Sequence, residues 1–427
     1  MPRGPLSTLT ALTFLLFISL SGCTGAEDID AGVAAQNDPI VLLISIDGAR
    51  HDYPELYNTP ALDRIAEAGT RANHIEMVFP TKTFPTHYTL VTGLYPSNHG
   101  VVSNSMYDPE MDASFSLGDR EQMANPEWWE DGEPIWVTAE QQDVKTATFF
   151  WPGSDVEIHG VRPSEYRDYD GSVPGEERVE TILEWLDEPA EERPSFLTLY
   201  FSEVDSRGHS YGPESPEVAE AMANVNGYLN QLLDGLEERR LTDQVNLIVT
   251  TDHGMSETSQ ERVILLDDYI DVDDVHIVDY TPSLMIRPEN EEQEWEIYDA
   301  LSDAHPSMSI YMQEDLPEHL NFTDHPRIPS IIGLADDGWT ITTRDFFEDD
   351  PGRVDGGAHG YDQTISSMHG IFYAQGPFFQ EDHMTGPFQA INLYELMTHI
   401  LGITPAENDG SLEDALESLE IEAQRAE

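Results

Sequence analysis

Acidic and histidine side chains follow several apolar runs of this 427-residue sequence, and these residue types are metal ligands in proteins. Such side chains come after three of these runs: Asp47 after residues 40–46, Asp205 and His209 after residues 195–201, and Asp252 and His253 after residues 245–250. Continuous apolar runs of this length are typical of strands buried on both faces. Because the carboxyl ends of parallel strands form the ligand crevice of an open α/β sheet, we expect the five side chains to lie together.

A sixth side chain of this kind is expected, and two histidines compete for the place. His359 lies in the glycine-rich segment 356–362, and His369 lies directly before the apolar run 371–374. A glycine-rich loop lets a side chain reach into a site, which favours His359. Spacing alone does not decide which of the two histidines joins the site.

Carboxylates and imidazoles that converge need a cation between them, because their lone pairs otherwise repel one another or stay unsatisfied. Aspartate and histidine together suit zinc. Three of each supply two zinc ions with three protein ligands apiece and leave coordination positions open, as catalytic zinc requires. Taken singly, each residue also fits a strand-end turn or a surface position, so the prediction depends on their convergence.

A second feature is the segment Phe79–Tyr88, FPTKTFPTHY, which contains Pro80 and Pro85. The prolines place the start of a helix near Thr83. Free backbone N–H groups and the helix dipole at such a position favour an anion such as phosphate or an alkoxide. A threonine hydroxyl becomes a nucleophile when a metal ion lowers its pKa. The alternative is that Thr83 only caps the helix.

Five segments together resemble the nucleotide pyrophosphatase/phosphodiesterase family of the alkaline phosphatase superfamily: PTKTFPTHYTLVTGLYPSNHGVVSNSMYDP at 80–109, ISIDGAR, DSRGH, TDHGM and AHGYD. The resemblance extends from residue 40 to about residue 402. It implies an α/β fold, an alkaline-phosphatase-like three-layer sandwich with a mainly parallel central sheet and an insertion or cap region. The alternation of predicted strands and helices independently favours an α/β sandwich.

The resemblance also implies a division of the ligands between two zinc ions. One ion would be held by Asp47, Asp252 and His253, with Thr83 as its fourth ligand. The other would be held by Asp205, His209 and His359. The string His-Gly-Tyr-Asp at 359–362 resembles the family's last ligand motif, and on that ground His359 is preferred to His369.

Four further residues acquire roles through the same resemblance. Asn104 would donate a hydrogen bond to a non-bridging phosphate oxygen. Phe84 and Tyr169 resemble the aromatic residues that sandwich the base of the substrate, and Tyr200 resembles a pocket residue near the phosphate. Core packing explains the three aromatic residues equally well.

Two positions depart from the pattern that we associate with the family. Gly175 stands where relatives often carry a large residue, and Gln363 stands where they often carry Asn. Neither departure removes a predicted metal ligand.

The predicted reaction is zinc-dependent hydrolysis of nucleotide phosphodiester or pyrophosphate bonds through a covalent phosphothreonine. One rival is a phosphomonoesterase of the same superfamily, which needs extra positive charge that Lys82, Arg50 or Arg162 could supply. A sulfatase fits less well, because the nucleophile segment lacks a Cys/Ser-x-Pro-x-Arg pattern. A rival of another class is a catalytically silent surface lipoprotein that binds metal or nucleotide. The natural substrate and the oligomeric state stay open.

The composition is strongly acidic. Asp and Glu number 82 against 20 Lys and Arg, giving a net charge of -62. Such a surface repels nucleic-acid backbones, so we expect no nucleic-acid-binding surface and a small-molecule substrate instead. The excess is spread along the chain, which suggests adaptation to high salt; high solubility is the alternative.

The N-terminus resembles a bacterial lipoprotein signal. Arg3 and the apolar run 9–20 are followed by Leu20-Ser21-Gly22-Cys23, which resembles a lipobox. We therefore expect residues 1–22 to be removed and Cys23 to carry a lipid anchor on the periplasmic face of the bacterial envelope, with Thr24 favouring the outer membrane. An ordinary secretory signal is the alternative. As Cys23 is the only cysteine, no intramolecular disulfide is possible.

The rest of the chain divides into three parts. Residues 23–38 are expected to be an acidic tether, residues 39–405 the phosphodiesterase domain with an irregular insertion at about 255–355, and residues 406–427 an acidic tail whose residues 411–416 could begin a short surface helix. Helices are predicted for residues 58–68 and 216–236, and no internal repeat is found.

Overall fold

The structure is a computed structural model that describes residues 39–421, and it is built on one large sheet. The predicted signal segment, Cys23 and the tether lie outside the described residues. Eight strands form the sheet, in this order: β19 (His383–Thr385), β2 (Gly69–Ala72), β18 (Phe372–Gln375), β9 (Val245–Thr250), β1 (Ile40–Ile46), β8 (Phe196–Phe201), β6 (Thr146–Phe149) and β7 (Glu165–Arg167).

The pairing of these strands is mainly parallel, as predicted. Only the two pairings that β18 makes, with β9 and β2, are antiparallel. Strands β1 and β9 have the predicted bounds, and β8 begins one residue later than predicted. The three strands lie side by side in the order β9, β1, β8, so their carboxyl ends share one edge.

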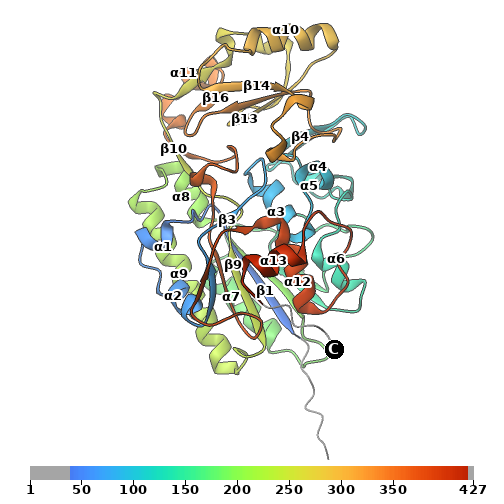
Figure 1. Ribbon diagram of the computed structural model, residues 1–427, viewed down its shortest axis with the longest axis vertical. Helices are drawn as coiled ribbons and strands as arrows, with labels where there is room; N and C mark the ends of the chain where they lie inside the picture. Colours follow the sequence, from blue (N-terminus) through green and yellow to red (C-terminus); the bar gives the residue numbers. More distant parts are fainter. Residues whose placement is uncertain (1–38, 422–427) are drawn as a thin grey trace, which may run out of the picture. The chain divides into compact units, whose positions relative to one another are not determined.

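Alternate residues of β1 enter two different apolar cores, because successive side chains of a strand point to opposite faces. Leu42 and Ile44 pack with helices on one face, whereas Val41 and Leu43 pack with helices on the other. The first face is covered by α2 (Pro60–Glu67), α7 (Gly175–Leu186) and α9 (Pro216–Arg239). The second is covered by α3 (Thr83–Thr92), α6 (Ile135–Glu140), α12 (Leu393–Leu401) and α13 (Leu412–Ser418). The result is the three-layer sandwich of Figure 1.

The region that the sequence marks as irregular has a core of its own. An antiparallel sheet runs in the order β12 (His276–Asp279), β13 (Ser283–Arg287), β15 (Ile331–Ala335) and β14 (Met308–Met312). It packs with α10 (Glu291–Leu301) around residues such as Leu284, Ile286 and Ile297. Figure 1 shows this layer, with α11 (Arg344–Asp349), at the end of the molecule away from α2 and α7.

The fold also contains several short elements. The remaining α-helices are α1 (Tyr53–Leu56), α4 (Pro96–His99), α5 (Arg120–Met123) and α8 (Glu203–Tyr211). Four strand pairs complete the described fold: β3 (Ile75–Glu76) with β20 (Phe388–Gln389), β4 (Ser105–Asp108) with β5 (Ala113–Ser116), β10 (Ser256–Thr258) with β17 (Gly356–Ala358), and β11 (Val263–Leu265) with β16 (Thr340–Thr342).

The described part of the acidic tail contains the helix expected after residue 411. The Ser411 hydroxyl caps α13 by accepting the Asp414 N–H. Ala415, Leu416 and Leu419 are buried in the main core, so the helix packs more closely than a solvated surface helix. Within residues 39–421, no helix combines the length and the apolar character needed to cross a bilayer.

Candidate two-metal active site

The predicted ligands lie at the carboxyl edge of three adjacent strands. Asp47 follows β1, and Asp252 and His253 follow β9. Asp205 and His209 lie one turn apart on α8, which begins just after β8, so both side chains project from the same face of that helix.

The turn after β1 depends on Gly48. Its backbone has φ of +71°, and a Cβ there would lie 2.9 Å from the Cα of Asp205. Glycine therefore permits both the left-handed backbone and the close approach of α8 to the strand end. The same residue donates its N–H to Asp252 Oδ1 at 3.1 Å, which joins the ends of β1 and β9.

Six side chains converge here in two groups of three. Within each group the ligand atoms lie within 4.8 Å of one another, and the groups are Asp47, Asp252 and His253, and Asp205, His209 and His359. The two groups adjoin, because His253 and His359 stack with ring centroids 3.4 Å apart. The structure brings His359 to this site and places His369 elsewhere, beside His74.

Each of the three histidines is held by a backbone carbonyl. The Nδ1 atoms of His209, His253 and His359 lie 2.8, 2.9 and 2.8 Å from the carbonyl oxygens of Gly357, Gly254 and Thr81, in that order. A carbonyl oxygen only accepts, so in each ring Nδ1 carries the proton and Nε2 presents a lone pair to the site. This is the arrangement in which histidine binds a metal ion.

The atoms that face the site lack partners among the described residues. Three buried carboxylate oxygens, Asp47 Oδ1, Asp205 Oδ1 and Asp252 Oδ2, accept no hydrogen bond. The Nε2 atoms of His209 and His359 lie only 3.1 Å apart, although neither carries a proton when neutral. Lone pairs gathered in this way fit two cations, so the residues present match a pair of zinc ions.

Without a bound cation, the surroundings of Asp47 disfavour the ionised form of its carboxyl group. Burial, followed by the charges of Asp252 and Asp205, raises the pKa of Asp47 well above its usual range. For Asp252, burial also acts to raise the pKa, but His253 and His87 outweigh it and lower the pKa well below its usual range. A bound divalent cation would favour the ionised form of all three carboxylates.

Thr83 is the first residue of α3, and its hydroxyl faces the first group. Thr83 Oγ1 lies 3.5 Å from His253 Nε2. Lys82 occupies the N-cap position, and its side chain makes no capping hydrogen bond. The alternative in which Thr83 only caps the helix therefore lacks its hydrogen bond.

Two buried residues that the sequence did not single out for this purpose support Thr83 and its neighbours. His87, one helical turn after Thr83, lies 2.8 Å from the Thr83 carbonyl oxygen through Nδ1 and 3.3 Å from Asp252 Oδ2. The Tyr200 hydroxyl donates to Asp47 Oδ2 at 2.5 Å, so Tyr200 orients a predicted ligand. Burial, followed by the charges of Asp47 and Asp252, raises the pKa of Tyr200 well above its usual range, which keeps this donor protonated.

An aromatic cavity of about 320 Å³ opens beside these groups. Asp47, Thr83 and Asp205 line one part of it. The predicted residues Phe84, Tyr169 and Tyr200 line it too, together with Leu117, Arg120, Met123, Trp129, Phe150, Trp151 and Arg167. Sequence reasoning missed Trp129 and Trp151, since nothing in their spacing separates them from core residues.

Asn104 lies beside the helix start. Its Oδ1 accepts the Phe84 N–H at 2.9 Å, and no hydrogen bond of the described residues uses its side-chain nitrogen. The amide nitrogen is thus available for a ligand, while the oxygen fixes the side chain against α3.

Lys82 joins the second sheet to the nucleophile segment. Its Nζ lies 2.6 Å from Asp279 Oδ2, and the Ser103 hydroxyl donates to the same oxygen at 2.5 Å. Asp279 belongs to β12, so one carboxylate ties the residues preceding Thr83 and Asn104 to the region 255–355. No local pattern indicates this contact.

The two departures noted in the sequence have local explanations. A Cβ on Gly175 would lie 2.2 Å from the Tyr228 ring, so this tyrosine fills the space that a larger residue would need. The Gln363 side chain donates to the His319 carbonyl at 2.7 Å, and His319 also contacts Asp362.

Comparison with known proteins agrees with this geometry. The family model for type I phosphodiesterase/nucleotide pyrophosphatase matches residues 41–362. The chain belongs to this family. The resemblance seen in the sequence is thereby confirmed.

Relatives and solved structures extend the match over most of the chain. Human ectonucleotide pyrophosphatase/phosphodiesterase family member 1 is 41% identical over 384 residues, which cover 87% of this chain and 41% of the human protein. Venom phosphodiesterase CdcPDE of Crotalus durissus collilineatus is 38% identical over 398 residues, which cover 91% of this chain and 47% of that protein. The chain thus spans less than half the length of these curated relatives.

The fold is that of this family as well. Murine ectonucleotide pyrophosphatase/phosphodiesterase 5, solved as an inactive threonine-to-alanine variant in complex with AMP, superposes with a TM-score of 0.84 at 37% identity and covers 90% of this chain and 100% of that chain. The human protein 5 gives a TM-score of 0.84 at 38% identity, covering 89% of this chain and 99% of that one. The expected alkaline-phosphatase-like fold is confirmed.

Proposed function

We propose that this member of the family hydrolyses phosphodiester or pyrophosphate bonds of nucleotides, with Thr83 as the nucleophile. The observation that carries the proposal is the convergence of six metal-ligand side chains from separate segments beside one threonine hydroxyl. The curated relatives that the chain matches are named phosphodiesterases, and the chain covers less than half of their length, so this activity is proposed for the chain itself.

Two zinc ions are the proposed cofactors. Asp47, Asp252 and His253, with Thr83, would hold one, and Asp205, His209 and His359 would hold the other. Bound zinc lowers the pKa of a coordinated hydroxyl and neutralises charge on the phosphoryl and leaving-group oxygens.

The residues of the chain supply the remaining chemistry. Thr83 Oγ1 loses its proton and forms a bond to phosphorus as the bond to the leaving-group oxygen breaks, which gives a phosphothreonine ester. Water then loses a proton and forms a bond to phosphorus as the bond from phosphorus to Oγ1 breaks, and Oγ1 takes up a proton to restore the threonine hydroxyl. The Asn104 amide donates to a non-bridging oxygen, and the positive end of the α3 dipole favours the developing charge.

The aromatic cavity suits the base of a nucleotide. Phe84 and Tyr169 both line it, and the Arg120 guanidinium lies 5.5 Å from the Tyr169 ring centroid. Offset aromatic contacts and a nearby cation favour a flat heterocycle. The AMP bound by the murine relative supports a nucleotide over other diesters.

Phosphomonoester hydrolysis is the competing reaction of the same superfamily. Its dianionic substrate needs additional cations, but Lys82 pairs with Asp279, and Arg50 pairs with Asp52. None of Lys82, Arg50 and Arg162 lines the cavity, and the two arginines that do, Arg120 and Arg167, lie over the rings of Tyr169 and Trp185. This favours the diester reaction.

A substrate panel decides between the reactions. Rates on bis(4-nitrophenyl) phosphate, 4-nitrophenyl phosphate and a dinucleoside pyrophosphate are measured with and without a chelator. We expect the diester and the pyrophosphate to be preferred and the chelator to abolish turnover. Preference for the monoester would favour phosphomonoester hydrolysis instead of the proposed function. Unchanged rates in chelator would show that the reaction does not need the proposed metal ions.

Export and lipid anchoring remain part of the proposal, and the sequence around Cys23 supports them. Mass spectrometry of the N-terminal peptide of the protein from its native membrane tests this directly. We expect a diacylglyceryl-modified Cys23 at the N-terminus, whereas an unmodified residue at this position would disprove the anchor.

A further inference from the structure

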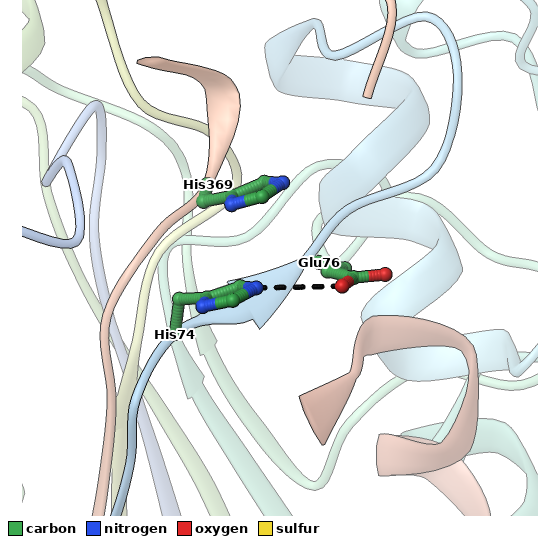
Figure 2. A group of neighbouring side chains, drawn as sticks. All are labelled: His74, Glu76 and His369. Carbon is green, nitrogen blue, oxygen red and sulfur yellow. Dashed lines mark hydrogen bonds and ion pairs between the residues drawn. The ribbon is translucent and has the colours of Figure 1, made fainter. Parts of the chain in front are cut away.

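A second cluster of histidine and carboxylate side chains lies outside the candidate active site. His74, Glu76 and His369 present one ligand atom each, and these atoms lie within 4.8 Å of one another. Figure 2 shows the rings of His74 and His369 face to face, with the Glu76 carboxylate beside His74. None of the three residues belongs to the proposed catalytic groups.

The backbone places these side chains on one face. Ile75 and Gly370 form an antiparallel bridge in which each N–H donates to the carbonyl of the other, at 2.9 and 3.0 Å. Continued by one residue, this register sets Glu76 opposite His369. His74 lies two residues before Glu76 and so shares its face.

The distances suit a common ion. His74 Nε2 and Glu76 Oε1 are 3.3 Å apart, which is about the separation of two ligands on a tetrahedral zinc ion. The rings of His74 and His369 lie 4.2 Å apart and within 3° of parallel. One nitrogen of each ring and a Glu76 oxygen lie within 4.8 Å of one another, so rotation of the stacked rings would be needed for all three to bind one ion.

Two further observations point to a ligand. His369 Nε2 is buried and has no hydrogen-bond partner among residues 39–421. The other oxygen of Glu76 accepts the Gln389 side-chain amide at 2.5 Å, so the carboxylate is already oriented from β20. All three side chains are only partly buried, which leaves a route for an ion from solvent.

We propose that His74, Glu76 and His369 form a third metal site, which binds a divalent transition-metal ion of the zinc class. Two imidazoles and one carboxylate are a common zinc ligand set. The ion would fasten β3 to the segment before β18. That segment also accepts the Gly254 N–H through the Met368 carbonyl, at 3.0 Å, and Gly254 follows a predicted catalytic ligand. The role is structural and goes beyond the proposed function.

Zinc stoichiometry tests the site. The full chain is stripped with a chelator, reloaded with Zn²⁺, desalted and assayed for zinc per chain by mass spectrometry. We expect His74→Gln and Glu76→Gln each to hold one zinc fewer than the wild type. A wild type and variants with equal zinc content would overturn the proposal.

The matched control is His383→Gln. His383 has nearly the same side-chain exposure as His74, 23% against 20%, and also faces a glutamate, Glu420, at 3.6 Å, but it belongs to no three-ligand group among the described residues. Its zinc content should equal that of the wild type. The readout is a difference of one ion, so it holds even if the candidate active site binds no zinc.

A second measurement separates metal loss from misfolding. Because an ion that binds only the folded state stabilises it by mass action, added Zn²⁺ should raise the melting temperature of a chain with the site more than that of a chain without it. We expect a smaller zinc-induced rise for His74→Gln than for His383→Gln. Equal rises in the two variants would contradict the proposal.

Discussion

The two histidine and carboxylate clusters of this protein differ in how their side chains are held. At the candidate active site each imidazole has its Nδ1 fixed by a backbone carbonyl, and His253 and His359 are buried. In the second cluster no such carbonyl bond holds His74 among the described contacts, and its ring lies beside Glu76, His369 and His51. The first cluster is preorganised, and the second would close when an ion binds.

This difference in how the side chains are held indicates what each cluster can do. Catalysis needs ligands and nucleophile fixed before the substrate arrives, since reorganisation during the reaction costs free energy. A site that only joins two chain segments tolerates small rotations on binding. We therefore expect substitutions in the first cluster to change turnover and those in the second to change metal content and stability.

The sharpest test of this contrast is Thr83→Ala. It should lower kcat by at least about a thousandfold, because the nucleophile is lost, while the zinc content stays close to that of the wild type. Kinetics on a diester and zinc analysis of the same sample measure both quantities. Thr83→Ser keeps a hydroxyl and should retain part of the activity; near-normal turnover of the alanine variant would rule out the covalent route.

Asn104→Ala should have the next largest effect. Loss of one preorganised donor costs about 2.7–4 kcal/mol in the transition state, or about 10²–10³ in kcat. The Phe84 N–H also loses its acceptor, so the melting temperature is recorded alongside the kinetics. A loss as large as that of Thr83→Ala, with unchanged melting, would mean that Asn104 does more than stabilise charge.

Tyr200→Phe should lower metal affinity or activity by about 10–100-fold. It removes the hydrogen bond to Asp47 and leaves a ligand without its orienting partner. Titration of the stripped protein with zinc, followed by diester kinetics at saturating zinc, separates the two effects. Unchanged values in both experiments would show that Asp47 is held by other contacts.

His74→Gln should have the smallest effect on catalysis. Its kcat on a diester should stay within about twofold of the wild type, since truncation of one ligand of a remote site leaves the preorganised groups in place. Steady-state kinetics at saturating zinc measure this. A large loss of turnover would mean that the two clusters are coupled through residues 367–370 and Gly254, and the contrast between them would fail.

Much of this site could be predicted from local sequence. The runs that became β1, β8 and β9 are apolar without interruption, and burial on both faces imposes that pattern residue by residue. Asp47 follows β1 directly and Asp252 follows β9 after one residue, so a parallel order of the strands was enough to bring them together. Thr83 was placed at a helix start by its neighbouring prolines.

Other parts could not be predicted, because they depend on partners far away in the chain. Spacing alone left His359 and His369 open, and the family resemblance decided for His359; in the structure β17 pairs with β10 and the Thr81 carbonyl contacts the His359 ring. The link from Lys82 to Asp279 spans two sheets. Trp129 and Trp151 became cavity residues only through the packing around α3.

The sequence by itself determined the central strands, the residue types at their ends and the family, because the burial of a strand and the chemistry of a ligand depend on neighbouring residues. Only the tertiary structure decided which nitrogen each ring presents and that residues 74, 76 and 369 share a face. Those facts follow from the register between distant segments, and a one-residue shift of that register would turn each side chain to the opposite face.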